Sequence, residues 1–125
     1  MTSTLDSGAA PEPAYPGYCR VILARHVRET TDLDPSQRMR LAAVVFAVED
    51  AVRETMRPDK MNVASLGNVV PHLHWHVIPR YADDAHFPAP VWAQAARTTD
   101  EAVLVARRAL VPQLAEAIAR RFASR

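Results

Sequence analysis

The sequence predicts an α+β fold in which an antiparallel sheet is covered by one main helix and a C-terminal helix. Three observations support this prediction: segments with strand periodicity, a long amphipathic segment between them, and a short glycine-containing turn that favours antiparallel pairing of the last two strands. At 125 residues with 49% hydrophobic side chains, the chain has the size of one domain. We expect this domain to span residues 15–125.

Residues 1–14 are expected to form a flexible N-terminal arm. This segment and the two residues after it are rich in Ser, Gly, Ala and Pro. Pro11, Pro13 and Pro16 are spaced closely enough to oppose both helix formation and sheet pairing.

The first strand and the main helix follow the arm. Residues 18–24, YCRVILA, are apolar and β-branched, which favours a strand buried on at least one face. Asp34 and Pro35 match an N-cap and a first helical residue, and Gln37 completes a capping box. Pro58 disfavours helical geometry in the residue before it and should end the helix. Apolar side chains recur at steps of four and three, which predicts an amphipathic helix: Leu41, Val45, Val48 and Val52.

Two further strands are expected after this helix. Residues 60–68, KMNVASLGN, are typical of a short strand that runs into a Gly-Asn turn. Residues 72–77, HLHWHV, alternate strictly, and this period of two predicts a strand with its three histidines on one face. Pro79 limits further pairing, and residues 81–92 have the prolines and polar cluster of an irregular loop.

The last predicted element is a helical segment over residues 98–124. It is expected to start at Thr98, with Glu101 completing a second capping box. Pro112 should leave the segment kinked or split, because an interior proline removes one backbone hydrogen bond and clashes with the preceding turn.

Composition and charge argue against several function classes. The chain has 15 basic and 14 acidic residues, so no strong field is available to gather nucleic acid or a membrane surface. Cys19 is the single cysteine and cannot form an internal disulfide, which favours a reducing compartment. We find no signal-peptide pattern and no run near the roughly 18 apolar residues of a membrane span. We therefore expect a cytoplasmic protein that binds neither nucleic acid nor a membrane.

His72, His74 and His76 carry the chemistry that the sequence predicts. Same-face positions on a strand lie about 6.6–7 Å apart, so the three rings form a row. A neutral imidazole is a good nucleophile near pH 7, because a hydrogen bond to one ring nitrogen exposes the lone pair of the other. Attack on a phosphoryl ester, anhydride or amidate gives a phosphohistidine-type intermediate. The flanking rings can then steady a phosphate oxygen or protonate the leaving group.

Metal binding is the stronger rival interpretation, because a His-x-His pair on a strand can share one zinc or iron ion. The third histidine of a row would not easily reach the same ion, and no nearby Cys or Glu completes a ligand set. In the following loop, the candidate metal ligands are Asp83, Asp84 and His86. A single histidine such as His86 is, however, more often a structural polar residue. We predict neither a metal nor a cofactor.

The segment HLHWHVI resembles the motif of the histidine triad (HIT) family of nucleotide hydrolases and transferases. The similarity to bacterial HIT proteins covers most of residues 15–92. The resemblance implies that His74 is the nucleophile that becomes nucleotidylated, that His72 orients it, and that His76 contacts phosphate or assists the leaving group. It also implies supporting roles near the triad or the nucleotide phosphate for His26, Asn62 and Asn68.

Each supporting residue has a second interpretation. His26 would otherwise be a polar residue at a strand end, Asn62 an ordinary strand residue, and Asn68 a turn former. Arg80 either balances phosphate charge or lies exposed in a loop. Trp92 either lines the pocket or contributes to a dimer contact.

Two features depart from the HIT pattern. Val69 stands where many HIT proteins have a serine or threonine hydroxyl near the phosphate, and its side chain donates no hydrogen bond. The residues before Tyr15 show neither the additional strands that help form the nucleoside pocket nor a Cys-x-x-Cys zinc site. These departures support an alternative function, that of a catalytically weak or inactive HIT-fold protein that binds nucleotides.

The function that the sequence predicts is hydrolysis of nucleoside phosphate derivatives, such as phosphoramidates or dinucleoside polyphosphates, through a covalent nucleotidyl-histidine. A nucleotidyl transferase would use the same intermediate with another acceptor. The expected partner is a nucleotide, and the resemblance implies a homodimer.

Overall fold

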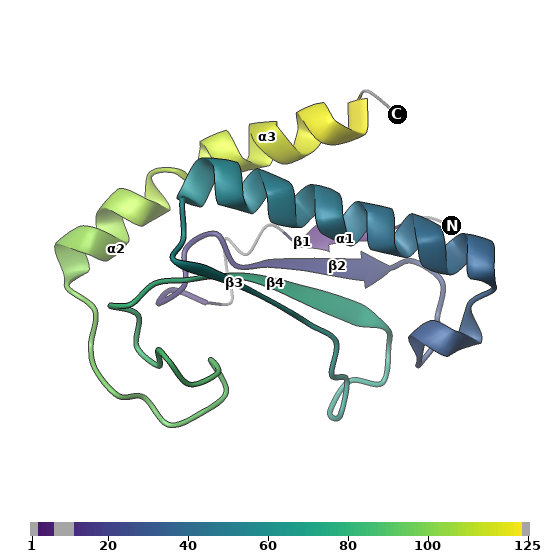
Figure 1. The fold of residues 1–125 in the computed structure, drawn as a ribbon, viewed down its shortest axis with the longest axis horizontal. Coiled ribbons are helices and arrows are strands. Elements are labelled where there is room, and N and C mark those ends of the chain that lie inside the picture. Colours follow the sequence, from purple (N-terminus) through teal and green to yellow (C-terminus); the bar gives the residue numbers. More distant parts are fainter. Residues whose placement is uncertain (1–2, 7–11, 124–125) are drawn as a thin grey trace.

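The sheet has four antiparallel strands and carries its helices on one face (Figure 1). The computed structural model describes residues 3–6 and 12–123. Over this part of the chain the strands are β1 (Ser3–Asp6), β2 (Cys19–Leu23), β3 (Lys60–Ala64) and β4 (His74–Arg80). Their order is β1-β2-β4-β3, so β4 lies between β2 and β3. The predicted α+β class is confirmed.

The main helix begins and ends where the sequence predicts. The described helices are the 3-10 turn η1 (Thr30–Asp32), α1 (Pro35–Met56), α2 (Glu101–Arg108) and α3 (Val111–Ala123). At the start of α1, the Gln37 N–H donates to the Asp34 carboxylate at 2.8 Å, and the Gln37 side-chain oxygen accepts from the Asp34 N–H at 3.0 Å. The helix ends at Met56, and its C-cap Arg57, directly before Pro58, is left-handed with φ 49°.

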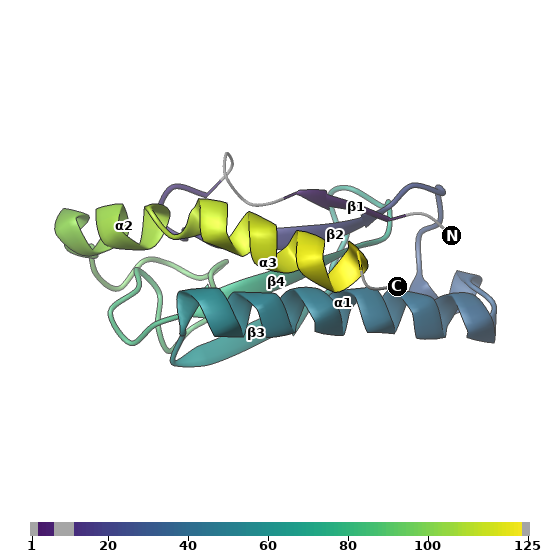
Figure 2. The same cartoon turned by 90° about the horizontal axis from the view of Figure 1, so that it is seen from above.

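The core lies between the helices and one face of the sheet, and α3 runs beside α1 (Figure 2). The apolar stripe of α1 is buried as predicted, and it packs against side chains of α3 and of the sheet: Leu114, Ala117, Ile118, Val21, Leu23 and Val77. Burial of apolar surface contributes about 25 cal/mol per Å², so these contacts hold the helices on this face. The opposite face of β2 and β4 carries His74 and His76 together with the apolar Ile22 and Ile78.

Residues 3–6 differ from the predicted N-terminal arm, because they pair as β1 with the outer edge of β2. The prolines that oppose pairing begin at Pro11 and therefore do not interrupt these residues. An unpaired strand edge offers N–H and C=O groups to any extended segment that reaches it. Residues 1–2 and 7–11 of the predicted arm lie outside the described residues.

The C-terminal helical segment begins at Glu101 rather than at Thr98. Asp100 supplies the N-cap, and the hydroxyl of Thr99 instead donates to the Asp83 carbonyl at 2.8 Å. Because Thr99 is bonded to the preceding loop, the helix starts after it. The sequence pattern missed this contact because Asp83 is distant along the chain.

The predicted break near Pro112 is confirmed, since α2 ends at Arg108 and α3 begins at Val111. Pro112 thus lies in the first turn of α3, where a missing N–H leaves no helical hydrogen bond unmade. Residue 124 lies outside the described residues. No helix in the described ranges has the length and apolarity to span a membrane.

Candidate active site

His74 and His76 project from β4 on the sheet face that α1 does not cover. The strand register places Ile22 of β2 opposite His74 and Arg20 opposite His76. The ring centroids of His74 and His76 are 5.0 Å apart. The alternation of β4 therefore brings these two imidazoles together on one face, as predicted.

His72 precedes β4, so the strand predicted over residues 72–77 begins two residues late. Leu73 is bonded to the region where β2 ends: its N–H donates to the Val27 carbonyl at 2.7 Å, and its C=O accepts from the Leu23 N–H at 3.3 Å. The imidazole of His72 lies 2.5 Å, through Nε2, from the Leu23 carbonyl. His72 is thus held by hydrogen bonds to the region where β2 ends rather than by regular strand pairing.

The backbone of His72 determines which nitrogen of His74 is free. Nδ1 of His74 lies 2.6 Å from the His72 carbonyl oxygen. A carbonyl oxygen only accepts, so Nδ1 carries the proton and Nε2 of neutral His74 keeps a lone pair. His74 is therefore presented as the tautomer that a nucleophile requires.

His26 joins the row at its far end. Its Nδ1 lies 3.1 Å from Nδ1 of His72, and the two ring centroids are 5.1 Å apart. Because Nε2 of His72 donates to the Leu23 carbonyl, Nδ1 of neutral His72 is an acceptor for the His26 N–H. The structure thus places His26 against the triad, although its side chain is exposed.

Tyr18 bonds to His76 and was not identified from the sequence. Its hydroxyl lies 2.7 Å from Nδ1 of His76, and both side chains are buried. Burial raises the pKa of Tyr18 to about 12, whereas burial, aided by His74 and Arg20, lowers the pKa of His76 to about 4. At neutral pH the hydroxyl therefore donates to Nδ1, and Nε2 of neutral His76 carries the N–H. The alternation of β2, which puts Tyr18 on the face of Arg20 and Ile22, was the available signal.

Two hollows flank His74 on this face. One, of about 400 Å³, is lined by residues 66–70, His74, His76 and Trp92. The other, of about 410 Å³, is lined by Arg20, Ile22, Val70, His72 and His74. Asn68 thus lies beside the histidines, and Val69, at 92% exposure, stands at the rim. A ligand bound at His74 has room on both sides.

The sequence model of the HIT domain family matches residues 9–83. The chain belongs to the histidine triad (HIT) family. It is similar over 89% of its length to a histidine triad protein of Bradyrhizobium japonicum, with a TM-score of 0.66, 29% identity and 82% of that chain covered.

Two curated relatives of the HIT domain have names that include a substrate. The chain is 32% identical over 81 residues to an AP-4-A phosphorylase of Mycobacterium tuberculosis, a match that covers 60% of this chain and 42% of that protein. It is 32% identical over 78 residues to a bis(5'-nucleosyl)-tetraphosphatase (asymmetrical) of Schizosaccharomyces pombe, covering 58% of this chain and 43% of that protein. The chain thus spans less than half the length of either relative.

Arg80 has neither of the roles considered for it from the sequence. It is 1% exposed, its guanidinium bonds to the Asp84 carboxylate at 2.8 and 3.1 Å, and it donates to the Ala89 carbonyl at 2.7 Å. It also donates to the side-chain oxygen of Asn62 at 2.7 Å. Asn62 lies opposite Ile78 in the strand register and so on the histidine face, but it bonds to Arg80 and does not line the hollows at His74.

The loop after β4 is anchored by this buried ion pair. Burial raises the pKa of Asp84, but hydrogen bonds from Arg80 and from three backbone N–H groups outweigh this effect and hold its pKa at about 2. His86 bonds through Nδ1 to the Tyr15 hydroxyl at 2.5 Å and stacks on the Tyr15 ring. These contacts fit the structural role considered for His86. Across the described residues, no group of three or more His, Cys, Asp or Glu side chains is arranged to hold a metal ion.

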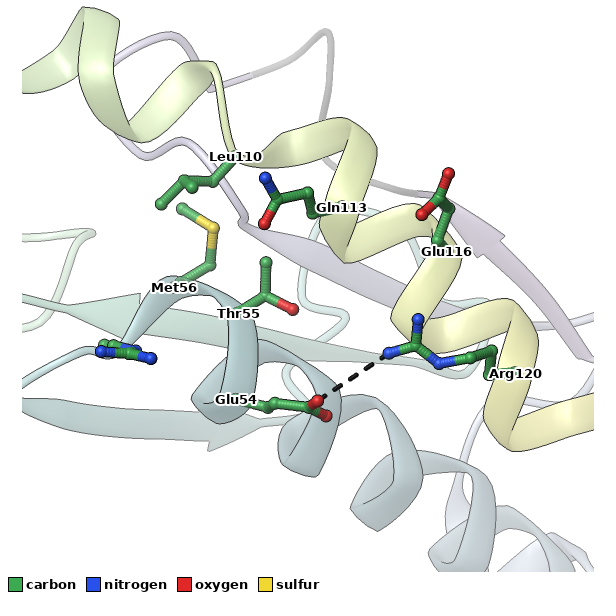
Figure 3. A pocket seen from close by; sticks show the side chains of 8 residues that line it. Glu54, Thr55, Met56, Leu110, Gln113, Glu116 and Arg120 are labelled. Atoms are coloured by element: carbon green, nitrogen blue, oxygen red, sulfur yellow. Dashed lines mark ion pairs between the residues drawn. The ribbon is translucent and has the colours of Figure 1, made fainter.

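A further hollow, of about 530 Å³, lies on the helical side of the HIT domain (Figure 3). It lies between the end of α1 and α3, where Arg120 and Glu54 form an ion pair at 3.8 Å. No histidine lines it, and it lies across the core from the triad. The two hollows beside His74 are therefore the candidate substrate site.

Proposed function

We propose that this HIT protein cleaves nucleoside phosphate derivatives through attack of His74 Nε2 on the α-phosphorus. The observation that carries the proposal is the hydrogen bond from Nδ1 of His74 to the His72 carbonyl at 2.6 Å. It leaves the Nε2 lone pair available in a side chain that lines both hollows. His26 and His72 support this geometry from the N-terminal side.

In the first step, the bond between His74 Nε2 and phosphorus forms, and the bond from phosphorus to the leaving group breaks. The N–H of His76 donates a hydrogen bond to the reacting group. A phosphate anion beside His76 favours its protonated form, in which Nδ1 has taken a proton from solvent and the Tyr18 hydroxyl turns to accept from it. This form releases its Nε2 proton to the departing atom and becomes neutral imidazole with the N–H on Nδ1 and a free lone pair on Nε2. In the second step, water attacks the phosphorus, neutral His76 accepts its proton, and His74 departs.

The two curated relatives support nucleotide derivatives as the substrate class. Their names include a phosphorylase and a tetraphosphatase, so they support both transfer to an acceptor and hydrolysis. We assign Asn68 to the phosphate, because it lines the hollow with His74 and His76. We assign Asn62 to the support of Arg80. We also propose a homodimer, as the resemblance to HIT proteins implies, and a cytoplasmic location, as the single cysteine favours.

Mass spectrometry of acid-sensitive adducts tests this mechanism. The protein is mixed with adenosine 5'-phosphoramidate, quenched at neutral or alkaline pH, digested and searched for a nucleotide-mass adduct. We expect the adduct on His74 in the wild type, together with AMP release. His74→Ala should lose both while it unfolds at the same urea concentration.

The main alternative is a HIT-fold protein that binds nucleotides without cleaving them. The specific observation in its favour is the apolar Val69 at the rim of the hollow. AMP binding by calorimetry, without adduct or AMP release across phosphoramidate and dinucleoside polyphosphate substrates, would favour this alternative and reject the catalytic proposal.

A further inference from the structure

The hollow between β2 and the histidines has one charged side chain in an otherwise apolar and imidazole wall. Its volume is about 410 Å³, and Ile22 and Val70 supply apolar side chains next to His72 and His74. Arg20 is the one Lys, Arg, Asp or Glu among the described residues that line it. A ligand in this hollow therefore meets a single cation beside two apolar surfaces.

The nucleoside half of the substrate fits this hollow better than the leaving group does. In the proposed mechanism His76 gives its proton to the departing atom, and His76 lines the hollow of residues 66–70 but not the hollow over β2. His74 lines both, so a phosphorus atom at its Nε2 lies between them. The leaving group therefore departs on the side of residues 66–70, and the nucleoside extends toward β2. A flat base there buries apolar surface against Ile22 and Val70.

The guanidinium of Arg20 is held from two directions. Its carbon lies 4.8 Å from the centroid of the Tyr18 ring, and Nη2 donates to a carboxylate oxygen of Glu12 at 3.4 Å. The side chain of Arg20 is 18% exposed. An arginine that is already held in one position loses less conformational freedom when it bonds to a ligand. Arg20 is therefore suited to select among ligands by the pattern of their acceptors.

A guanidinium distinguishes the two common purine bases by this pattern. It carries five N–H donors in a planar fork and has no acceptor. Guanine presents two acceptors, N7 and O6, on one edge, so the fork can donate to both. Adenine presents N7 beside an amino group that is itself a donor. Two donors that face each other make no hydrogen bond, so guanine is the better partner for Arg20.

We propose that Arg20 contacts the base of the bound nucleotide and selects 6-oxopurines, guanine above all, over adenine. This inference rests on the proposed function and names the nucleotide class that the same site prefers. Arg20 donates to N7 and O6, while Ile22 and Val70 contact the face of the ring. The bonds at phosphorus change as in the proposed mechanism, and Arg20 takes part in no bond change. The preference differs from the AP-4-A in the name of the Mycobacterium tuberculosis relative.

Three substrates with one leaving group test the inference. The 5'-phosphoramidates of guanosine, inosine and adenosine all release ammonia, so the ratios of their kcat/KM values report the base alone. We expect the wild type to favour guanosine over adenosine by about fivefold or more, which corresponds to about 1 kcal/mol, the lower end of what an arginine fork supplies on guanine. Inosine keeps N7 and O6 but lacks the 2-amino group, and it should be cleaved as well as guanosine.

Substitutions of Arg20 test whether this residue is the source of the preference. Arg20→Leu should bring the ratio of guanosine to adenosine close to one. Arg20→Lys keeps the charge but lacks the planar fork, so it should lose most of the preference. Burial, together with the charges of His74 and Arg20, lowers the pKa of His76, so Arg20→Leu also alters the leaving-group step. This effect is common to the three substrates and cancels from the ratio.

Arg25→Leu is the matched control. Arg25 is exposed just after β2 and lines neither hollow at His74, so this variant should keep the wild-type ratio. Urea unfolding identifies a variant that has lost its fold. If Arg20→Leu does not fold, the comparison of Arg20→Lys with the wild type on the three substrates decides.

Each contrary outcome has a distinct meaning. A wild-type ratio of guanosine to adenosine near or below one, with both substrates cleaved, would overturn the inference and leave the proposed function intact. A preference that persists in folded Arg20→Leu, or that inosine does not share, would show that another group contacts the base and would also overturn it. A folded wild type that cleaves none of the three substrates would reject the proposed function, and the inference would fall with it.

Discussion

The hydroxyl of Tyr18 lies 2.7 Å from Nδ1 of His76, so a side chain next to the start of β2 sets the tautomer of the third histidine. The His72 carbonyl sets the tautomer of His74 through Nδ1 at 2.6 Å. Tyr18 is a donor and the carbonyl is an acceptor. The two neighbouring rings therefore present opposite groups at Nε2, a lone pair on His74 and an N–H on His76.

Tyr18→Phe should weaken catalysis most where the leaving group needs a proton. Without the hydroxyl, Nδ1 of His76 loses its donor and the N–H is no longer held at Nε2. We expect kcat for an alkylamine phosphoramidate to fall about fivefold to tenfold, the effect of one hydrogen bond of about 1 kcal/mol. A p-nitrophenyl ester of AMP, whose phenolate needs no proton, should lose less than about twofold.

Tyr81→Phe is the matched control for this variant. Its hydroxyl donates to the Met56 carbonyl at 2.6 Å and is also buried, but Tyr81 does not line the hollows at His74. Both variants should lose similar stability, and Tyr81→Phe should keep the wild-type ratio between the two substrates. If Tyr18→Phe slows both substrates equally, the hydroxyl has only a structural role.

The stability of the protein should decrease as the pH falls from about 6.5 to about 4. Burial lowers the pKa of His76 from 6.5 to about 4 in the folded protein, so the unfolded chain binds more protons in this window. Unfolding is therefore favoured by acid, by up to about 3 kcal/mol at the low end. Urea unfolding of the wild type and of His76→Gln at several pH values measures the difference, and the variant should have the shallower slope.

The contribution of Asp84 falls in a separate pH window. Its pKa is about 2 when folded and 3.8 as a free side chain, so its stabilisation is present above about pH 4 and is lost as the pH falls toward 2. His76→Gln should leave this second decrease in place. Coincident slopes for wild type and variant between pH 6.5 and 4 would show that His76 is not the group responsible.

Asp84→Asn should destabilise the protein by about 3 kcal/mol or more. The change leaves the guanidinium of Arg80 buried without its counter-charge, and both side chains are 2% exposed. Asp83→Asn, in the neighbouring position, breaks a pair with Arg107 at 2.9 Å in which the carboxylate is 50% exposed, and it should cost less than about 1 kcal/mol. Urea unfolding at pH 7 compares them, and equal values would contradict a structural role for the Arg80–Asp84 pair.

Substitution of Asn62 should lower stability, whereas substitution of Asn68 should weaken substrate binding. Asn62→Ala removes the oxygen that accepts from Arg80 at 2.7 Å, so we expect a loss of about 1–2 kcal/mol in stability with KM within about twofold. Asn68→Ala, on an exposed turn beside His74, should raise KM severalfold and leave stability unchanged. Steady-state kinetics with urea unfolding measures both. A large KM change in Asn62→Ala, with none in Asn68→Ala, would show that Asn62 contacts the phosphate and would contradict the assignment of Asn68.

Local pattern was sufficient for most of the secondary structure. The capping box at Asp34, the stop at Pro58 and the stripe on α1 each depend on residues a few positions apart, and the structure has all three. The alternation from His74 also holds, so the position of His74 and His76 on one face of the sheet was predictable. The start of this strand was predicted wrongly. It begins at His74 and not at His72, because hydrogen bonds of Leu73 to the end of β2 replace regular pairing there.

The sequence by itself determined the α+β class, the main helix, the placement of His74 and His76 on one strand face and membership of the HIT family. Only the tertiary structure decided that His76 bonds to Tyr18 and that Arg80 is buried. It also decided that Asn62 bonds to Arg80 and that Trp92 lies beside His76. Tyr18 and His76 are 58 positions apart, and Arg80 and Asn62 are 18 apart. Periodicity assigns a side chain to a face, but its hydrogen-bond partner depends on how β2 and β3 register against β4 and on the path of the loop after β4.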